Sequence, residues 1–198
     1  MAQNTSLRRE MIMKTLSLHD VDSSDSLVWP EDFAEIDLHA PALTLLTDFH
    51  RHEPLVVNGD MHASEAERLL RQSHVGMKLV GSSRGEFIGT VSRDALSEAN
   101  RIKRIAAGFE PADLRVRDMM TPRHQIQAID LDALGSACVG DIVETLRFHG
   151  QRHCLVVDPA QHHICGLIAA SDIARRLHVN LDVDGPPTFA QIHDAVGH

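Results

Sequence analysis

Hydrophobic and polar positions follow nearly the same pattern twice along the chain, from Ser64 to Leu96 and again from Asp141 to Ile173. Each stretch predicts an amphipathic helix, two short hydrophobic strands joined by a polar turn, and a second helix. The two stretches align without a gap at a constant offset of 77 residues, the separation of Gly89 from Gly166. A duplication of this kind predicts two structural units that share an interface.

Polar residues mark the expected starts of the helices. Ser64 and Glu67 predict a capping box at the first helix, and Asp141 opens the corresponding helix of the second unit. Ser92 and Ser171 predict the caps of the two closing helices, the first of which we expect to run to about residue 107. The hydrophobic runs predict strands at 55–57, 77–80, 87–91, 154–157 and 164–168.

The segments outside the two repeats have a different character. Hydrophobic residues between Phe33 and Thr47 predict an opening segment that packs beside the first repeat. The end of the chain carries a short amphipathic stretch, which we expect to dock either on the body of the protein or on another subunit. The predicted organisation is an N-terminal arm (1–30), repeat 1 (31–107), a linker (108–114), repeat 2 (115–179) and a C-terminal tail (180–198).

Composition narrows the class of protein. A chain of 198 residues with 43% hydrophobic content is long enough to form two small cores. The net charge of −9 and the 4% aromatic content disfavour a general nucleic-acid surface. No hydrophobic run is long enough to predict a membrane helix or a signal peptide, so we expect a cytoplasmic protein without a membrane partner. Three cysteines without a paired spacing are expected to be reduced and structural.

No pattern of residues predicts catalysis. The glycines do not form a dinucleotide-binding or phosphate-binding loop, and no nucleophile, base and acid are spaced as a recognisable set. Among the 14 histidines, the closest groupings are His50 with His52 and His162 with His163, and neither is completed by cysteine or acidic ligands into a zinc pattern. We therefore expect no catalytic residues, no metal site, no obligatory cofactor and no enzyme activity.

Several short segments of the two repeats resemble the motifs of a known family. In the second repeat these are the segments 116–122, 139–141, 149–158 and 166–173, and in the first repeat they are 46–48, 74–75 and 87–92. In this order, the motifs resemble the CBS domain, and a tandem pair of them resembles the Bateman module, with the second repeat as the stronger match. The resemblance implies an α+β fold of tandem βαββα repeats related by a pseudo-twofold axis, in a stand-alone protein of bacterial type.

The same resemblance implies a function. It predicts a regulatory module that senses an adenosine-containing ligand (AMP, ADP, ATP, NAD or S-adenosylmethionine) in the cleft between the repeats. Such a module signals through an effector protein that the sequence does not identify, and commonly forms a homodimer. Asp172 is the candidate carboxylate for the ribose hydroxyls and Arg152 the candidate for phosphate. The other candidate nucleotide-binding residues are Ser171, Met120, Thr121, Pro122, His153, Cys154, Ser92, Arg93, Asp94 and Thr47.

Departures from the family motif leave an alternative open. Ala169 replaces a hydroxyl residue in the second repeat, and Ala95 stands at the carboxylate position of the first, where Asp94 is displaced by one residue. One residue on a helix is about 100° of rotation, so we expect unequal sites with the better one at Asp172, whose change to alanine should weaken binding. The alternative is a structural or protein-interaction module that has lost its nucleotide.

Overall fold

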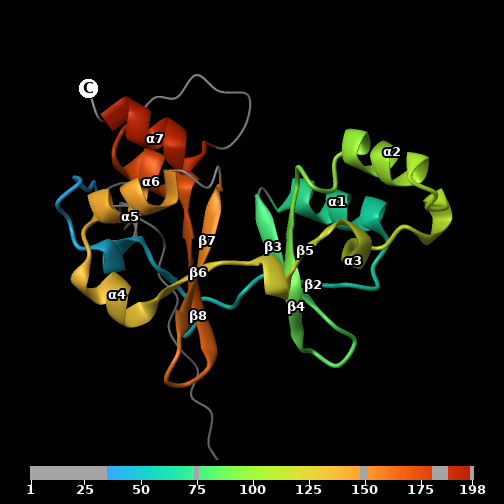
Figure 1. The fold of residues 1–198 in the computed structure, drawn as a ribbon, viewed down its shortest axis with the longest axis horizontal. Coiled ribbons are helices and arrows are strands. Elements are labelled where there is room, and N and C mark those ends of the chain that lie inside the picture. Colours follow the sequence, from blue (N-terminus) through green and yellow to red (C-terminus); the bar gives the residue numbers. More distant parts are fainter. Residues whose placement is uncertain (1–34, 74–75, 148–150, 180–186, 197–198) are drawn as a thin grey trace, which may run out of the picture. The chain divides into compact units, whose positions relative to one another are not determined.

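The protein is described by a computed structural model that covers residues 35–73, 76–147, 151–179 and 187–196. The predicted arm at 1–30 lies outside these ranges. Two four-stranded sheets carry the fold, with helices α1–α3 beside one sheet and α4–α7 beside the other (Figure 1). Within the described ranges, every helix is too short or too polar to cross a membrane. The arrangement confirms the predicted α+β fold of two repeats.

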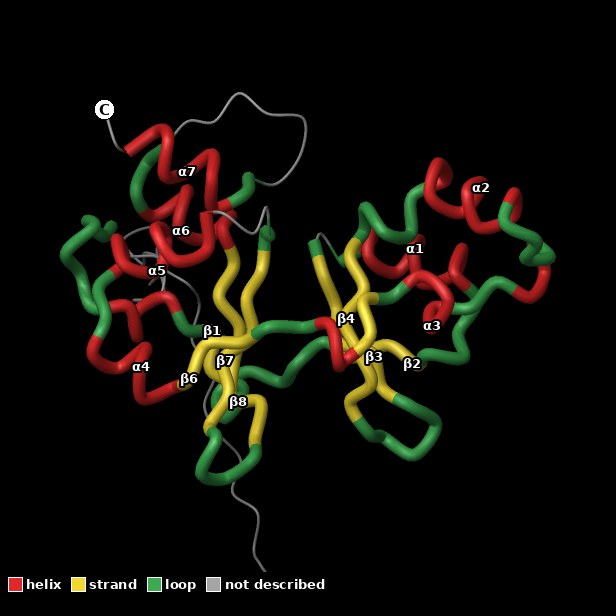
Figure 2. The backbone as a smooth tube through the Cα atoms, in the orientation of Figure 1, coloured by secondary structure: helices red, strands yellow, loops and turns green. Residues whose placement is uncertain are grey.

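Each repeat forms a strand, a helix or helices, a hairpin and a closing helix. The first repeat contains β2 (Val56–Asn58), α1 (Ala63–Gln72), β3 (Met77–Gly81), β4 (Phe87–Ser92) and α2 (Glu98–Ala106). The second contains β6 (Ala128–Asp130), α4 (Leu131–Ser136), α5 (Val139–Leu146), β7 (His153–Asp158), β8 (His163–Ala169) and α6 (Ala170–Arg176). In both, the first strand is parallel to the second and the hairpin is antiparallel. Figure 2 shows the strands of the two sheets in yellow.

The two repeats exchange their opening segments. Strand β1 (Thr47–Asp48) precedes the first repeat but pairs with β8 in the sheet of the second, which has the order β1-β8-β7-β6. Strand β5 (Thr121–Pro122) precedes the second repeat but pairs with β4 in the sheet of the first, which has the order β2-β3-β4-β5. The exchange ties the repeats together through main-chain hydrogen bonds.

The repeated glycines lie where the exchanged segments cross. A Cβ atom at Gly89 would clash with the carbonyl oxygen of Thr121, and one at Gly166 would lie 2.7 Å from the carbonyl oxygen of Thr47. Real Cβ atoms do not approach backbone oxygens this closely, so any larger residue would push the crossing strand away. Both glycines are therefore required by the same close approach, which explains why they align in the duplication.

The exchange corrects the expected packing of the opening segment. Ala42 and Leu45 lie in the core of the second repeat, not beside the first. Reciprocally, Leu114 and Val116 lie in the core of the first repeat, next to the short helix α3 (Val116–Met119). The prediction was wrong because neighbours in sequence were expected to pack together, whereas the pairing of β1 with β8 carries the preceding residues across.

The C-terminal tail docks on the body of the protein. Helix α7 (Phe189–Val196) buries Phe189 and Ile192 completely in the core of the second repeat. A polar contact adds to this packing, since His193 Nε2 lies 3.0 Å from a carboxylate oxygen of Glu144 on α5. Of the two arrangements predicted for this amphipathic stretch, the structure has the intramolecular one.

The helix starts differ from the predicted caps. Helix α1 is capped by the His62 ring, which accepts a hydrogen bond from the backbone N–H of Ser64, so Ser64 lies inside the helix. Helix α2 begins after Ser97 rather than at Ser92. Ser171 likewise lies inside α6, whose N-cap is Ala169, and α5 begins two residues before Asp141, at Val139. Cap residues are ambiguous where several polar residues cluster.

Candidate functional site

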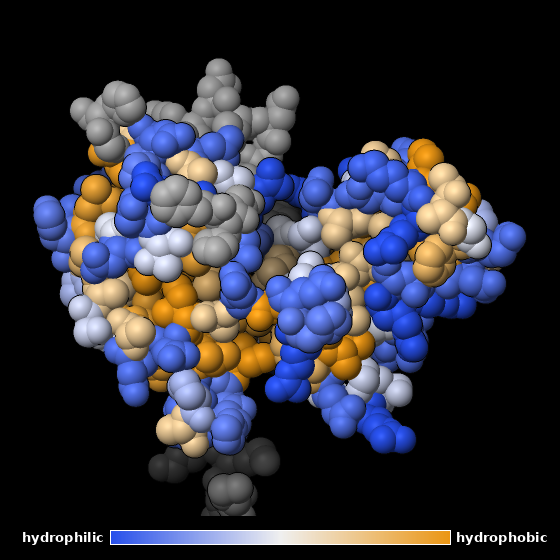
Figure 3. Space-filling view, viewed as in Figure 1, coloured by the Kyte–Doolittle hydropathy of each residue, from blue (hydrophilic) through white to orange (hydrophobic). Residues whose placement is uncertain are grey.

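A cleft of about 720 Å³ lies between the two repeats, where β3 and β7 begin. Figure 3 shows a hollow on this face of the molecule. Residues from both repeats line the cleft: from the first, Glu67, Arg71, Gly76, Met77, Thr90, Ser92, Arg93, Asp94 and Ser97, and from the second, Thr121, Gln125, Ile126, Gln127, Gln151, Arg152, His153 and Leu155. Its volume lies within the range of small-molecule sites.

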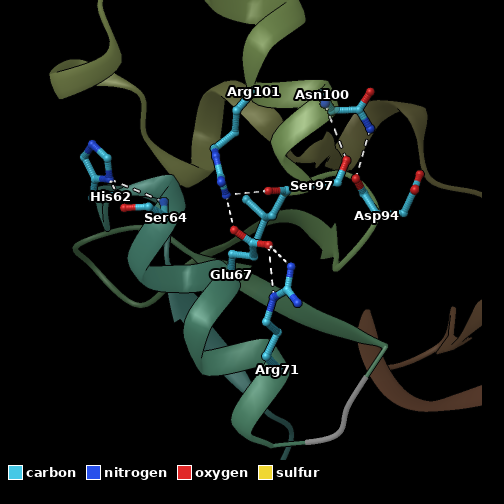
Figure 4. Close-up of polar contacts among 9 residues, drawn as sticks. His62, Ser64, Glu67, Arg71, Asp94, Ser97, Asn100 and Arg101 are labelled. Atoms are coloured by element: carbon cyan, nitrogen blue, oxygen red, sulfur yellow. Dashed lines mark hydrogen bonds and ion pairs between the residues drawn. The ribbon is translucent and has the colours of Figure 1, made fainter.

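A buried carboxylate holds one wall of the cleft in place. Glu67 of α1 is 8% exposed and accepts hydrogen bonds from Arg71 Nη2 at 2.6 Å and from Arg101 Nη1 on α2 (Figure 4). Arg101 also donates to the carbonyl oxygen of Leu96 at 2.8 Å. Burial raises the pKa of Glu67, but the hydrogen bonds from the two arginines outweigh it and leave the pKa below its ordinary value. Glu67 therefore joins two helices instead of completing the predicted capping box.

Two arginines in the cleft keep their charge available. Among the described residues, no hydrogen bond or ion pair engages the side chain of Arg93 or Arg152. Each lies next to the end of a strand, since Arg93 follows β4 and Arg152 precedes β7. Guanidinium groups favour planar anions such as phosphate, which they bind through two parallel hydrogen bonds. The pair makes this cleft a candidate anion site.

Asp94 lines the same cleft, and its carboxylate accepts no hydrogen bond from any described residue. It lies in a turn between β4 and α2, because α2 begins only at Glu98. The turn is held by Ser92 Oγ, which accepts from the backbone N–H of Ala95 at 3.0 Å, and by Asn100 Nδ2, which donates to the carbonyl oxygen of Asp94 at 2.9 Å. The predicted helical rotation between Asp94 and Ala95 therefore does not apply.

His153 forms part of the cleft floor. Its imidazole lies against the backbone of Gly76 from the other repeat, where an added Cβ atom would come within 3.1 Å of the ring. Burial of the ring, with a smaller contribution from the Arg152 charge, lowers the pKa of His153 to about 4. The imidazole is consequently neutral near pH 7 and able both to donate and to accept a hydrogen bond. The hydrophobic side chains of Met77, Ile126 and Leu155 lie in the same lining.

The structure divides the sequence-predicted residues between two places. Thr121 lies beside Thr90 of β4, the strand that leads to Ser92, Arg93 and Asp94. Thr47 lies beside β8, the strand that leads to Ser171 and Asp172. The exchange of opening segments thus brings the second repeat's opening residues to the closing turn of the first. Six predicted residues line the cleft: Ser92, Arg93, Asp94, Thr121, Arg152 and His153.

The other predicted residues lie elsewhere. Among the residues that the structure describes, the cleft lining does not include Thr47, Met120, Pro122, Cys154, Ser171 or Asp172. Asp172 forms an ion pair with Arg175 one turn along α6, at 2.9 Å. Cys154 is 3% exposed, and burial raises the pKa of its thiol to about 11. All three cysteines are free thiols.

Sequence reasoning missed several lining residues. Glu67 was expected only to complete a capping box, and no role was predicted for Arg71 or Ser97. Gln125 and Gln127 follow β5 in a short stretch without hydrophobic period or motif. Knowledge of the exchange would have found them, because β5 delivers this stretch to the first sheet. Within the described ranges, no three histidine, cysteine or acidic residues are arranged to hold a metal ion.

The fold and the cleft together define an internally duplicated α+β protein whose repeats share an open polar site. The family model of the CBS domain matches residues 46–101, which fall on the repeat with the weaker motifs. This segment of the chain is therefore similar to a CBS domain. No curated protein matches the chain in a sequence search.

Solved structures share the fold. A conserved protein from Pyrococcus horikoshii is 21% identical with a TM-score of 0.52, and the match covers 75% of this chain and all of that one. CBSX2 in complex with AMP is 21% identical, with a TM-score of 0.50 and coverage of 69% and 94%. The CBS-domain protein TA0289 from Thermoplasma acidophilum is 19% identical, with a TM-score of 0.50 and coverage of 76% and 75%. At these identities the similarity establishes the fold alone.

Proposed function

We propose that the protein is a regulatory binding module that holds an adenosine-containing nucleotide in the cleft between its repeats. The observation that carries the proposal is the meeting of Arg93, Asp94 and Arg152 in one cleft, each without a partner for its charged side chain among the described residues. Two guanidinium groups with unengaged donors and one carboxylate with unengaged acceptors match a ligand that carries both phosphate and vicinal hydroxyls. The AMP complex of CBSX2, which has the same fold, supports this choice of ligand.

Each part of the ligand has a chemical counterpart in the cleft. The phosphate is bound by Arg93 and Arg152, which would form charge-assisted hydrogen bonds with its oxygens. The ribose hydroxyls donate to the carboxylate of Asp94. The adenine ring packs on Met77 and Ile126, with the neutral His153 imidazole as a hydrogen-bond partner. This places the better site at Asp94, whereas the sequence motif favoured Asp172.

Regulation follows from the position of the cleft. Its two sides belong to different repeats, so a ligand that contacts both stabilises one relative arrangement of them over others. The free energy of binding is then available to change a surface that an effector protein recognises, and the effect is reciprocal. The proposed role is binding and signalling, as a homodimer, without a chemical reaction at the site.

A second candidate function has its own observation. Helix α2 buries no residue of its own, and it exposes hydrophobic side chains at Ile102 (57%) and Ile105 (38%), followed by Phe109 (38%). Together with the alanines at 95 and 169, this surface favours a protein-interaction module without a nucleotide.

Thermal unfolding of the nucleotide-free protein distinguishes the nucleotide-binding module from the protein-interaction module. The panel is AMP, ADP, ATP, NAD and S-adenosylmethionine, with inorganic phosphate as the control for simple anion binding. A ligand at about 100 times its dissociation constant stabilises the folded state by about 2.7 kcal/mol. We expect one member of the panel to raise the midpoint, and Arg152→Gln to abolish the rise while Arg68→Gln, on the exposed face of α1, leaves it unchanged. Absence of any shift would favour the interaction module.

A further inference from the structure

A second, smaller cleft of about 280 Å³ lies between the hairpin β7–β8 and the segment that joins β5 to β6. Its lining includes hydrophobic residues from both repeats, namely Phe87 of β4, Val157 and Ile164 of the β7–β8 hairpin, and Ile126. Ile126 and Leu155 both contribute to the lining of the two clefts, which are therefore adjacent.

One strongly basic side chain belongs to the lining of this cleft. Arg123 lines the cleft, is exposed, and forms no hydrogen bond or ion pair with any described residue through its guanidinium. Asp158 also lines the cleft, but its Oδ1 accepts hydrogen bonds from the backbone N–H groups of Ala160 at 2.9 Å and Gln161 at 3.1 Å. The carboxylate thus holds the hairpin turn, and the guanidinium keeps its donors for a ligand.

The hairpin turn presents a histidine at an unusual backbone position. His162 has φ of 56°, in the left-handed region, and it lines the cleft together with His163. The equivalent residue of the first repeat, 77 positions earlier, is Gly85 with φ of 80°. Glycine adopts this conformation without steric cost and histidine does not. His162, which has the higher steric cost at positive φ, lies in the turn that borders the cleft, and its imidazole is a further hydrogen-bond donor.

We propose that this cleft is a binding site for a small hydrophobic carboxylate, whose body packs on the hydrophobic lining and whose carboxylate pairs with Arg123. At about 280 Å³ the cleft lies near the lower limit of ligand-site volumes, which favours a short branched or aromatic acid over a nucleotide. Arg123 is the selective group, because a guanidinium binds a carboxylate through two hydrogen bonds and gains nothing comparable from a neutral amide. The site shares Ile126 and Leu155 with the nucleotide cleft, but its charged group, Arg123, lines only this cleft.

Calorimetric titration of the full-length, nucleotide-free protein at pH 7 tests the proposal. The probes are 4-methylpentanoate, its neutral amide, and the corresponding amine, 3-methylbutylamine. We expect the acid to bind at least tenfold more tightly than the amide, and Arg123→Gln to remove this preference. The control Arg68→Gln removes the same charge from α1 and should change nothing. Ala128→Phe, which fills the cleft without altering charge, should abolish binding of the acid.

Three results would overturn the proposal. The first is equal affinity for the acid and the amide. The second is tighter binding of the amine, which would assign the charge selection to Asp158. The third is an Ala128→Phe variant that binds the acid like the unchanged protein. The result for a variant is interpretable only if that variant is folded. Circular dichroism and the thermal midpoint of every variant therefore accompany the titration. Because Arg123 is exposed, Arg123→Gln is expected to fold and tests the proposal independently of Ala128→Phe.

Discussion

At the scale of single residues, His153 couples the cleft to the stability of the fold. The pKa of its imidazole is about 4 in the folded protein, against 6.5 for an ordinary histidine, because burial disfavours the charged form. Between these two values the unfolded chain binds more protons than the folded one. The free energy of unfolding contributed by His153 is therefore fully present above pH 6.5 and decreases as the pH falls toward 4.

This predicts a pH dependence that a substitution removes. The full shift corresponds to about 3 kcal/mol of unfolding free energy. Urea denaturation at pH 7 and pH 5 should show a loss of stability for the unchanged protein and a smaller loss for His153→Gln. The lowered pKa of Glu67 acts at lower pH, below its ordinary value of 4.5, and does not confuse this comparison. Equal losses in the two proteins would contradict the burial of a neutral imidazole.

Residue types in the site were predictable from sequence, but their grouping was not. Arg93, Arg152 and His153 were identified because they stand at positions that the family resemblance assigns to the ligand cleft. Asp94 was a candidate, but the better site was expected at Asp172, because a displacement of one residue on a helix beginning at Ser92 would rotate the Asp94 carboxylate by about 100°. The position of a helix start depends on competition among nearby caps, here Ser92 and Ser97, and sequence alone does not decide between them.

At the scale of elements, the exchange of opening segments determines which residues meet. The long strands β3, β4, β7 and β8 were predictable because short hydrophobic runs bounded by turns are a strong signal. Strands β1 and β5 have two residues each, and no periodic pattern can be recognised over that length. Their partners are selected by close packing against Gly89 and Gly166, which is a tertiary property.

The crossing glycines give a direct test of the exchange. Gly166→Ala should destabilise the protein by about 1–3 kcal/mol, because the added methyl group overpacks the contact with the Thr47 backbone. Gly135→Ala is the matched control, since a Cβ atom at this position of α4 meets nothing within 4 Å and should stabilise the helix by about 1 kcal/mol. Chemical denaturation measures both. Similar effects of the two changes would argue against the close approach.

Helix α7 is predicted to be an integral part of the second repeat. Phe189 is completely buried, so Phe189→Ala should cost about 3–5 kcal/mol of unfolding free energy through lost burial and a cavity. Ile102→Ala, at a side chain 57% exposed on α2, is the control and should change stability by no more than about 0.5 kcal/mol. A Phe189→Ala variant as stable as the unchanged protein would show that α7 does not dock as described.

At the scale of the whole molecule, the duplication has produced two repeats that are alike in backbone and different in chemistry. The first repeat presents Arg93 and Asp94 to the cleft, where the second has Ala170 and Ser171. The second repeat is in turn extended by α7, which packs on α5. The proposed nucleotide site is thus asymmetric, with one repeat supplying the carboxylate and the two repeats supplying one arginine each.

The most direct test of this account is the affinity for AMP, measured by isothermal titration calorimetry for the unchanged protein, Asp94→Ala and Asp172→Ala. Loss of a charged hydrogen-bond partner costs about 1.5–3 kcal/mol, which corresponds to a decrease in affinity of about tenfold or more. We predict that Asp94→Ala shows this decrease and that Asp172→Ala binds AMP like the unchanged protein. A decrease for Asp172→Ala with no change for Asp94→Ala would contradict the cleft site and restore the site suggested by the sequence motif.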